Sequence, residues 1–167
     1  TQPTLNLSGI ANDNLSLQSV VWSNAATLGG GTTLGVGSWS VPSISLNQGA
    51  NLITVTATDS VGNVGSATLT VTYDGTNPLI DIVTPDNTAT YLTTTRPLPI
   101  IGTASDNLSL VSVTWSSDRG GGGTATLGVP AAGQWSTSAY LVAGLNVLTF
   151  TATDAHGRTA TDTITID

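Results

Sequence analysis

The chain has 167 residues, no cysteine and a formal net charge of −7; its ten acidic residues are all Asp and its three basic residues are all Arg. This charge argues against a nucleic-acid or anionic-membrane surface, because both need clustered Lys and Arg. No apolar run approaches the roughly 20 residues of a spanning helix, so membrane insertion is excluded. The lack of Glu and Lys beside many Thr, Val and Ile residues favours strands over helices.

Short alternating segments in the first half of the chain predict β-strands over Gln18–Trp22, Leu52–Thr58 and Ala67–Tyr73. In the first of these, Val20 and Trp22 share one face, and we expect that face to point into a core. Turn-forming residues separate the segments, a pattern typical of a β-sandwich.

The second half predicts strands of the same kind over Leu79–Pro85, Val111–Trp115, Val147–Thr153 and Asp162–Ile166. The alternation in the second of these is clearer, because Val111, Val113 and Trp115 all lie on one face.

These elements recur because the sequence is an internal duplication. Three stretches of the first half return at offsets of about 93 to 96 residues: Asp13–Trp22 as Asp106–Trp115, Gly37–Ser40 as Gly133–Ser136, and Asn51–Asp59 as Asn146–Asp154. The changes of offset fall in Gly-rich stretches, where loops tolerate insertions.

The run from Asp74 to Pro78 predicts the boundary between the copies, which gives domains over residues 1–74 and 75–167. The second copy has an additional first strand near Leu79, for which the first copy has no counterpart. Either the chain is a piece of a longer array, or another chain supplies the missing strand. No signal-peptide pattern occurs, so we expect a mature chain or a fragment of a longer one.

The repeated motifs resemble the bacterial Ig-like modules that accompany glucodextranase-type enzymes and recur in surface adhesins. The matching residues are Gly9-Ile-Ala-Asn-Asp13-Asn14 with Gly102-Thr-Ala-Ser-Asp106-Asn107, then Gly49-Ala-Asn51 with Gly144-Leu-Asn146, and Gly62-Asn63. The second copy departs at the last motif, where Gly157-Arg158 stands. The resemblance implies an all-β fold of two tandem immunoglobulin-like antiparallel β-sandwich domains, and such modules serve as spacers, stalks and ancillary domains.

Catalytic chemistry is not expected from these residues. The only histidine, His156, lies in a predicted turn and aligns with Val61 of the first copy, so the repeated unit does not need it. The run Gly120–Gly123 lacks the Lys of a phosphate-binding loop and predicts a hairpin tip.

Calcium is the sharper expectation, because Ca²⁺ takes six to eight oxygen ligands from Asp, Asn, carbonyls and water. In the predicted sandwich, the loops that carry acidic residues and amides cluster at one end of each domain. The resemblance extends to calcium-stiffened adhesin and cadherin junctions, although no Glu ligand is present. The candidate ligands are Asp13, Asn14, Asp59, Asn63, Asp74, Asn77, Asp106, Asn107 and Asp154. The alternative is that these residues only form turns through local hydrogen bonds.

A carbohydrate platform is an alternative for Trp39 and Trp135, which follow a Gly at a predicted strand start. Core packing is the favoured interpretation, because a repeated core needs one Trp at each position in each copy. Asn6, Asn14 and Asn107 match the N-glycosylation pattern, which matters only in a host that modifies it.

The sequence therefore predicts a non-catalytic extracellular or cell-surface module, a spacer, stalk or assembly unit, with calcium as a stiffening cofactor in one version and no cofactor in the other. Its expected partners are neighbouring Ig-like modules or copies of itself, joined in one version by strand addition. The alternative is an ancillary carbohydrate-binding module of a secreted polysaccharide-degrading enzyme, with polysaccharide as its partner.

Overall fold

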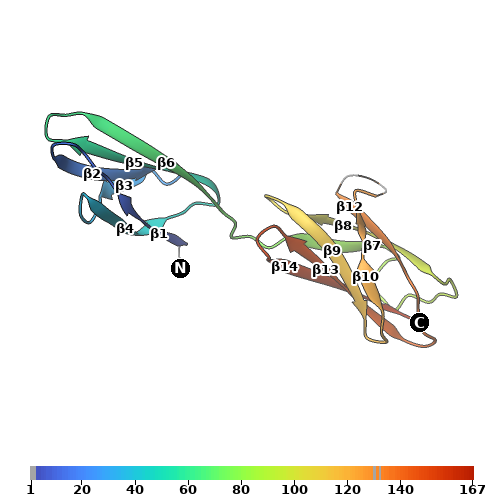
Figure 1. Ribbon diagram of the computed structural model, residues 1–167. Helices are drawn as coiled ribbons and strands as arrows, with labels where there is room; N and C mark the ends of the chain where they lie inside the picture. Colours follow the sequence, from blue (N-terminus) through green and yellow to red (C-terminus); the bar gives the residue numbers. More distant parts are fainter. Residues whose placement is uncertain (1–2, 130, 132) are drawn as a thin grey trace. The chain divides into compact units, whose positions relative to one another are not determined.

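A computed structural model describes residues 3–129, 131 and 133–167, and every regular element in them is a β-strand (Figure 1). The chain divides into two compact units, Thr1–Gly75 and Thr76–Asp167. This division falls one residue beyond the boundary that the sequence predicts.

The first unit holds two antiparallel sheets. Its larger sheet has the strand order β3-β2-β5-β6, and its smaller sheet has only β1 and β4 in the described residues. The strands are β1 (Thr4–Ile10), β2 (Leu17–Asn24), β3 (Gly29–Thr32), β4 (Ser38–Ser45), β5 (Gly49–Asp59) and β6 (Val64–Tyr73).

The second unit repeats this plan and adds to it. Its sheets have the orders β10-β9-β13-β14 and β11-β12-β8-β7. The strands are β7 (Leu79–Thr84), β8 (Leu98–Ser105), β9 (Leu110–Ser117), β10 (Gly122–Thr124), β11 (Thr126–Leu127), β12 (Gln134–Ala139), β13 (Asn146–Asp154) and β14 (Thr159–Ile166). Strand β7 is the additional first strand, and it pairs with β8.

Apolar side chains from both sheets meet in a core, which makes each unit a two-layer sandwich. In the second unit the core joins Ile100 and Trp135 of one sheet to Val113, Phe150 and Ile164 of the other. The first unit has a smaller core of the same kind, in which Val41 and Ile44 of one sheet face Ile53 of the other. The partly buried side chains that pack against these three are Leu5, Leu7, Trp22, Trp39 and Val71. The all-β prediction of two tandem Ig-like sandwiches is confirmed.

The inward direction expected for Trp22 and Trp115 agrees with their packing. Both rings are half-buried and lie against the cores of their units. Trp115 also stacks on Phe150, with ring centroids 6.4 Å apart.

The glycine run Gly120–Gly123 lies at the hairpin between β9 and β10. Gly120 and Gly121 form the turn with φ angles of 91° and 98°, a region that favours glycine because it has no Cβ. The next two glycines belong to β10, so only half of the run forms the tip.

A buried asparagine near the start of β5, and another at the start of β13, holds the loop that precedes its strand. The side chain of Asn51 donates to the carbonyls of Asn47 and Gly49 and accepts from the Asn47 amide. Asn146 makes the matching set with Val142 and Gly144. Both are less than 3% exposed, so these polar groups are satisfied inside the fold, and the repeated Asn has a structural role.

Candidate functional site

An aspartate closes the loop between β1 and β2, and another closes the equivalent loop between β8 and β9. Oδ2 of Asp13 accepts hydrogen bonds from the amides of Leu15 and Ser16. Oδ2 of Asp106 accepts the equivalent pair from Leu108 and Ser109, each at 2.9 Å. One oxygen of each carboxylate therefore forms the turn in which the sequence places it.

The hairpin between the last two strands of each repeat is built around a second aspartate. Oδ1 of Asp59 accepts from the amides of Val61 and Asn63, at 2.9 and 2.8 Å. Oδ1 of Asp154 accepts from the amides of His156 and Arg158, at 2.7 and 2.9 Å.

The two loops lie side by side at one end of each unit. The amide of Ser60 donates to the carbonyl of Ser16, and the amide of Ala155 donates to that of Ser109, both at 3.0 Å. The sequence-based expectation that these loops cluster describes the arrangement of both units.

The repeats differ at the second oxygen of the hairpin aspartate. In the first unit, Oδ2 of Asp59 accepts a hydrogen bond of 2.7 Å from the Asn63 side chain. Burial opposes the charged form of Asp59, but this bond and the backbone amides of Asn63 and Val61 outweigh it. The pKa of Asp59 therefore lies below its ordinary value of 3.8.

In the second unit Arg158 occupies the position of Asn63, so no amide side chain closes that oxygen. Oδ2 of Asp154 and Oδ1 of Asp106 are both buried and lack a hydrogen-bond partner among the described residues. Asp154 is only 2% exposed. Carboxylate oxygens of Asp106 and Asp154 lie within 4.8 Å of each other.

Two carboxylates this close repel each other, and an unpaired buried charge is costly. A cation between them removes both penalties. Two oxygens bound to one Ca²⁺ at 2.3–2.6 Å are at most about 5 Å apart, so the separation fits a shared ion.

Further oxygen donors line an open hollow of about 420 Å³ beside Asp106. Its walls include Thr76, Asn77 and Asn107, all within the second unit. The Thr76 hydroxyl donates to the side-chain oxygen of Asn107, a contact that no feature of the sequence indicated. The predicted ligands Asn77 and Asn107 thus lie next to Asp106.

Asp74 belongs to the first unit, directly ahead of the division of the chain. It is 4% exposed, and its Oδ1 accepts a hydrogen bond of 2.7 Å from the Gln48 side chain. The oxygen of the same Gln48 amide accepts from the Gly75 amide. No sequence pattern indicated Gln48, since a single Gln carries no motif. Asn14 is exposed on its loop.

The two tryptophans of the carbohydrate alternative have different environments. Trp135 is 0% exposed, stacks on Phe150 at a centroid distance of 4.7 Å, and donates from its indole nitrogen to the Thr103 carbonyl. It presents no face to a sugar, so the paired platform does not form in this structure. Trp39 is half-buried and lines a hollow in the first unit.

All regular secondary structure near these residues consists of β-strands. In the described part of the chain, no helix has the length and apolarity needed to cross a membrane. His156 lies in the exposed hairpin turn, as the sequence predicts.

Residues 1–75 match a family described as the bacterial Ig-like domain. This match confirms the resemblance to bacterial Ig-like modules over the first unit, and the second unit repeats its motifs and its strand plan. A comparison with curated proteins gave no match.

Three solved structures are similar to this chain. Fibronectin(III)-like modules of Clostridium thermocellum CbhA share 18% identity, with a TM-score of 0.46 and coverage of 97% of this chain and 83% of theirs. A tetra-tandem repeat from the extending region of a large adhesion protein shares 24% identity, with a TM-score of 0.42 and coverage of 97% and 44%. A 1.5-MDa bacterial ice-binding adhesin shares 23% identity, with a TM-score of 0.37 and coverage of 99% and 58%. The chain thus spans less than two thirds of either adhesin structure.

Proposed function

We propose that this chain is a non-catalytic structural or adhesive module of an extracellular or cell-surface protein, and that calcium binds at the start of its second unit. The family of the first unit and the structural use of its repeated polar residues support the first part. Asn51 and Asn146 hold loops, while Asp13 and Asp59 form turns, so the duplicated residues preserve a fold.

The observation that carries the calcium proposal is the pair of buried oxygens on Asp106 and Asp154 that lack a hydrogen-bond partner. Turn formation uses only one oxygen of each carboxylate. The remaining oxygens are too close together for two uncompensated charges, and oxygen ligands of this kind suit a hard divalent cation.

The proposed ligands are Asp106 and Asp154, with Asn77 and Asn107 as neighbouring oxygen donors, all within the second unit. An ion held there would restrict the freedom of the linker residues, which is the sense in which calcium would stiffen the module. The proposed ion belongs to the second unit alone, because in the first unit the Asn63 side chain already donates to the second oxygen of Asp59.

Calorimetric unfolding with millimolar Ca²⁺ and again with chelator tests the proposal. In 1 mM Ca²⁺, a site with a dissociation constant of about 100 μM or tighter should raise the unfolding temperature of the second unit by about 4 °C or more, since binding stabilises only the folded state. Asp154→Asn should remove this gain, and its matched control in the first repeat, Asp59→Asn, should retain it.

An unfolding temperature that is the same in calcium and in chelator would show that these carboxylates only form turns. The structural role would then stand without the metal.

A further inference from the structure

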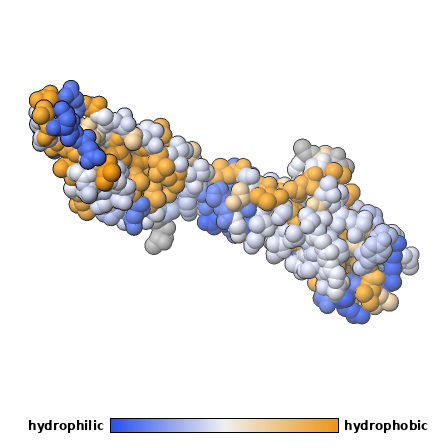
Figure 2. Space-filling view, in the orientation of Figure 1, coloured by the Kyte–Doolittle hydropathy of each residue, from blue (hydrophilic) through white to orange (hydrophobic). Residues whose placement is uncertain are grey.

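One aspartate of the chain is followed directly by a glycine. Strongly hydrophilic residues form only separate patches on the visible face of each unit (Figure 2), and all ten acidic residues are Asp. Of these ten, only Asp74 precedes a Gly, and no Asn precedes one. An Asp-Gly pair is especially prone to isomerise to isoaspartate, because glycine has no side chain to hinder attack by its amide nitrogen. Asp74–Gly75 is therefore the position in this sequence most exposed to that reaction.

The reaction at such a pair joins the Gly75 nitrogen to Cγ of Asp74. The amide proton and one carboxyl oxygen leave together as water, and a five-membered succinimide ring remains. Water then opens the ring at either carbonyl. Opening at the former side-chain carbonyl restores Asp, whereas opening at the main-chain carbonyl leaves isoaspartate, in which the main chain runs through Cβ and Cγ.

The side-chain amide of Gln48 holds both reacting groups. Its nitrogen donates to Oδ1 of Asp74, and its oxygen accepts from the Gly75 amide, each at 2.7 Å. We call these two hydrogen bonds the Gln48 clamp. The Gly75 nitrogen must give up its proton and turn toward Cγ before it attacks, so the reaction requires a local opening that breaks the clamp.

Local packing accounts for the glycine at this position. A Cβ at Gly75 would lie 2.7 Å from the Tyr73 hydroxyl oxygen and 3.0 Å from two carbons of the same ring. Tyr73 is the last residue of β6 and pairs with Gly49 of β5. A larger residue after Asp74 would have to displace that ring, so the packing favours the very residue that makes the pair labile.

The backbone on both sides of Gln48 is fixed by a buried side chain. Asn51 bonds to the amide and the carbonyl of Asn47 and to the carbonyl of Gly49. In the second unit Asn146 makes the same bonds around Ala143, which stands in the place of Gln48. The loop therefore forms without a glutamine, and the Gln48 side chain is available for the clamp.

We propose that Asp74–Gly75 is an isoaspartate-forming site, and that the Gln48 clamp keeps it from reacting while the first unit is folded. Isoaspartate at this position would redirect the main chain where it leaves β6 and would remove the carboxylate from the reach of Gln48. The inference concerns the first unit alone. It rests neither on calcium nor on the proposed role of the chain.

Prolonged incubation of the full chain at neutral pH, with chelator present, tests the proposal. Isoaspartate is quantified by enzymatic methylation of its carboxylate and located by peptide mass spectrometry. The chain unfolded in urea gives the rate without the clamp. The folded chain should react at least about tenfold more slowly, and Gln48→Ala should raise the folded rate about fivefold, because it removes two hydrogen bonds.

Two variants and one further measurement serve as controls. Gln18→Ala removes an exposed Gln of β2 and should leave the rate unchanged. Asp74→Ser removes the reacting carboxyl and should abolish isoaspartate at this position. Hydrogen exchange of β5 and β6 should be the same in Gln48→Ala as in the original chain, because the variant reproduces the loop that Ala143 forms in the second unit. Only the Gly75 amide should exchange faster.

Three outcomes would overturn the proposal. Equal isoaspartate formation in Gln48→Ala and the original chain would exclude Gln48 as the protecting group. A folded chain that reacts as fast as the chain in urea would exclude protection altogether. A faster reaction in Gln48→Ala with faster exchange throughout β5 and β6 would assign the change to loss of folding instead of loss of the clamp.

Discussion

The two units share one sequence pattern but differ in how far it is buried. Strand β14 buries Ile164 and Ile166 almost completely, whereas β6 leaves Leu69 substantially exposed and Val71 half-buried. The alternation of apolar residues is the same in both strands. Burial in a sandwich therefore depends on the facing strand as well as on the strand's own sequence.

The two units also differ in their aspartate hairpins. The hairpin of the first unit satisfies both oxygens of Asp59, and that of the second satisfies only one oxygen of Asp154. A single replacement, Asn63 by Arg158, accompanies the change from a hairpin with both aspartate oxygens hydrogen-bonded to one that leaves a buried oxygen of Asp154 without a partner. Two repeats with the same fold can thus differ in the hydrogen bonding of a single hairpin aspartate.

The largest effect should distinguish the two cores. Ile164→Ala should lower the free energy of unfolding of the second unit by about 2–5 kcal/mol, because it leaves a cavity beneath a complete sheet. Leu69→Ala should cost the first unit less than about 1 kcal/mol, since its side chain already contacts solvent. Strand-resolved hydrogen exchange on the full chain measures both. Equal losses would contradict the view that the first unit has the more open core.

A smaller effect on stability should appear at Gly9, which faces Trp39 of β4, and at Gly102, which faces Trp135 of β12. A Cβ at Gly102 would meet both the Trp135 ring and the backbone carbonyl of Asp81 in β7. A Cβ at Gly9 would meet only the Trp39 ring. Gly102→Ala should therefore cost about 1–3 kcal/mol and Gly9→Ala less, because Trp39 is half-buried and free to shift.

Denaturant unfolding of the two glycine variants measures this difference. A larger loss of stability for Gly9→Ala than for Gly102→Ala would contradict the view that the first unit has the more open core.

The smallest effect concerns pH and the first unit alone. The folded pKa of Asp59 lies below its unfolded value of about 3.8, so its charge contributes stability above that pH. This contribution is lost as the pH falls through the folded pKa. Asp59→Asn should therefore flatten the acid limb of the curve of unfolding free energy against pH, below about pH 4.

The matched control for this titration is Asp81→Asn, an exposed position on β7. It should leave the acid limb of the first unit unchanged. An identical acid limb for Asp59→Asn and the original chain would remove Asp59 as the titrating group.

Local sequence rules were sufficient for the elements and their repetition. Alternation around Trp22 and Trp115 predicted inward faces, and Gly and Asp residues predicted the turns, because strands and turns depend on neighbours in the chain. The same rules placed Asp106 and Asp154 in adjacent loops. They did not indicate that Thr76 and Gln48 would hydrogen-bond to candidate ligands, since such contacts join residues distant in sequence.

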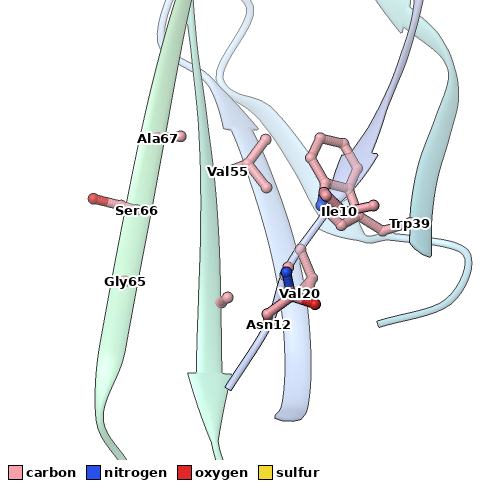
Figure 3. Close-up of a pocket in the computed structure, with 10 residues that line it drawn as sticks. Ile10, Asn12, Val20, Trp39, Val55, Gly65, Ser66 and Ala67 are labelled. Carbon is pink, nitrogen blue, oxygen red and sulfur yellow. The ribbon is translucent and has the colours of Figure 1, made fainter. Parts of the chain in front are cut away.

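By itself, the sequence determined a duplicated all-β chain and its boundary near Asp74. Only the tertiary structure decided that Trp135 is a core residue, that Asp154 keeps a buried oxygen unpaired, and that an apolar groove lies beside β1 (Figure 3). The physical reason is that periodicity assigns a side chain to a face of its strand. Whether that face is covered depends on the strands that fold against it.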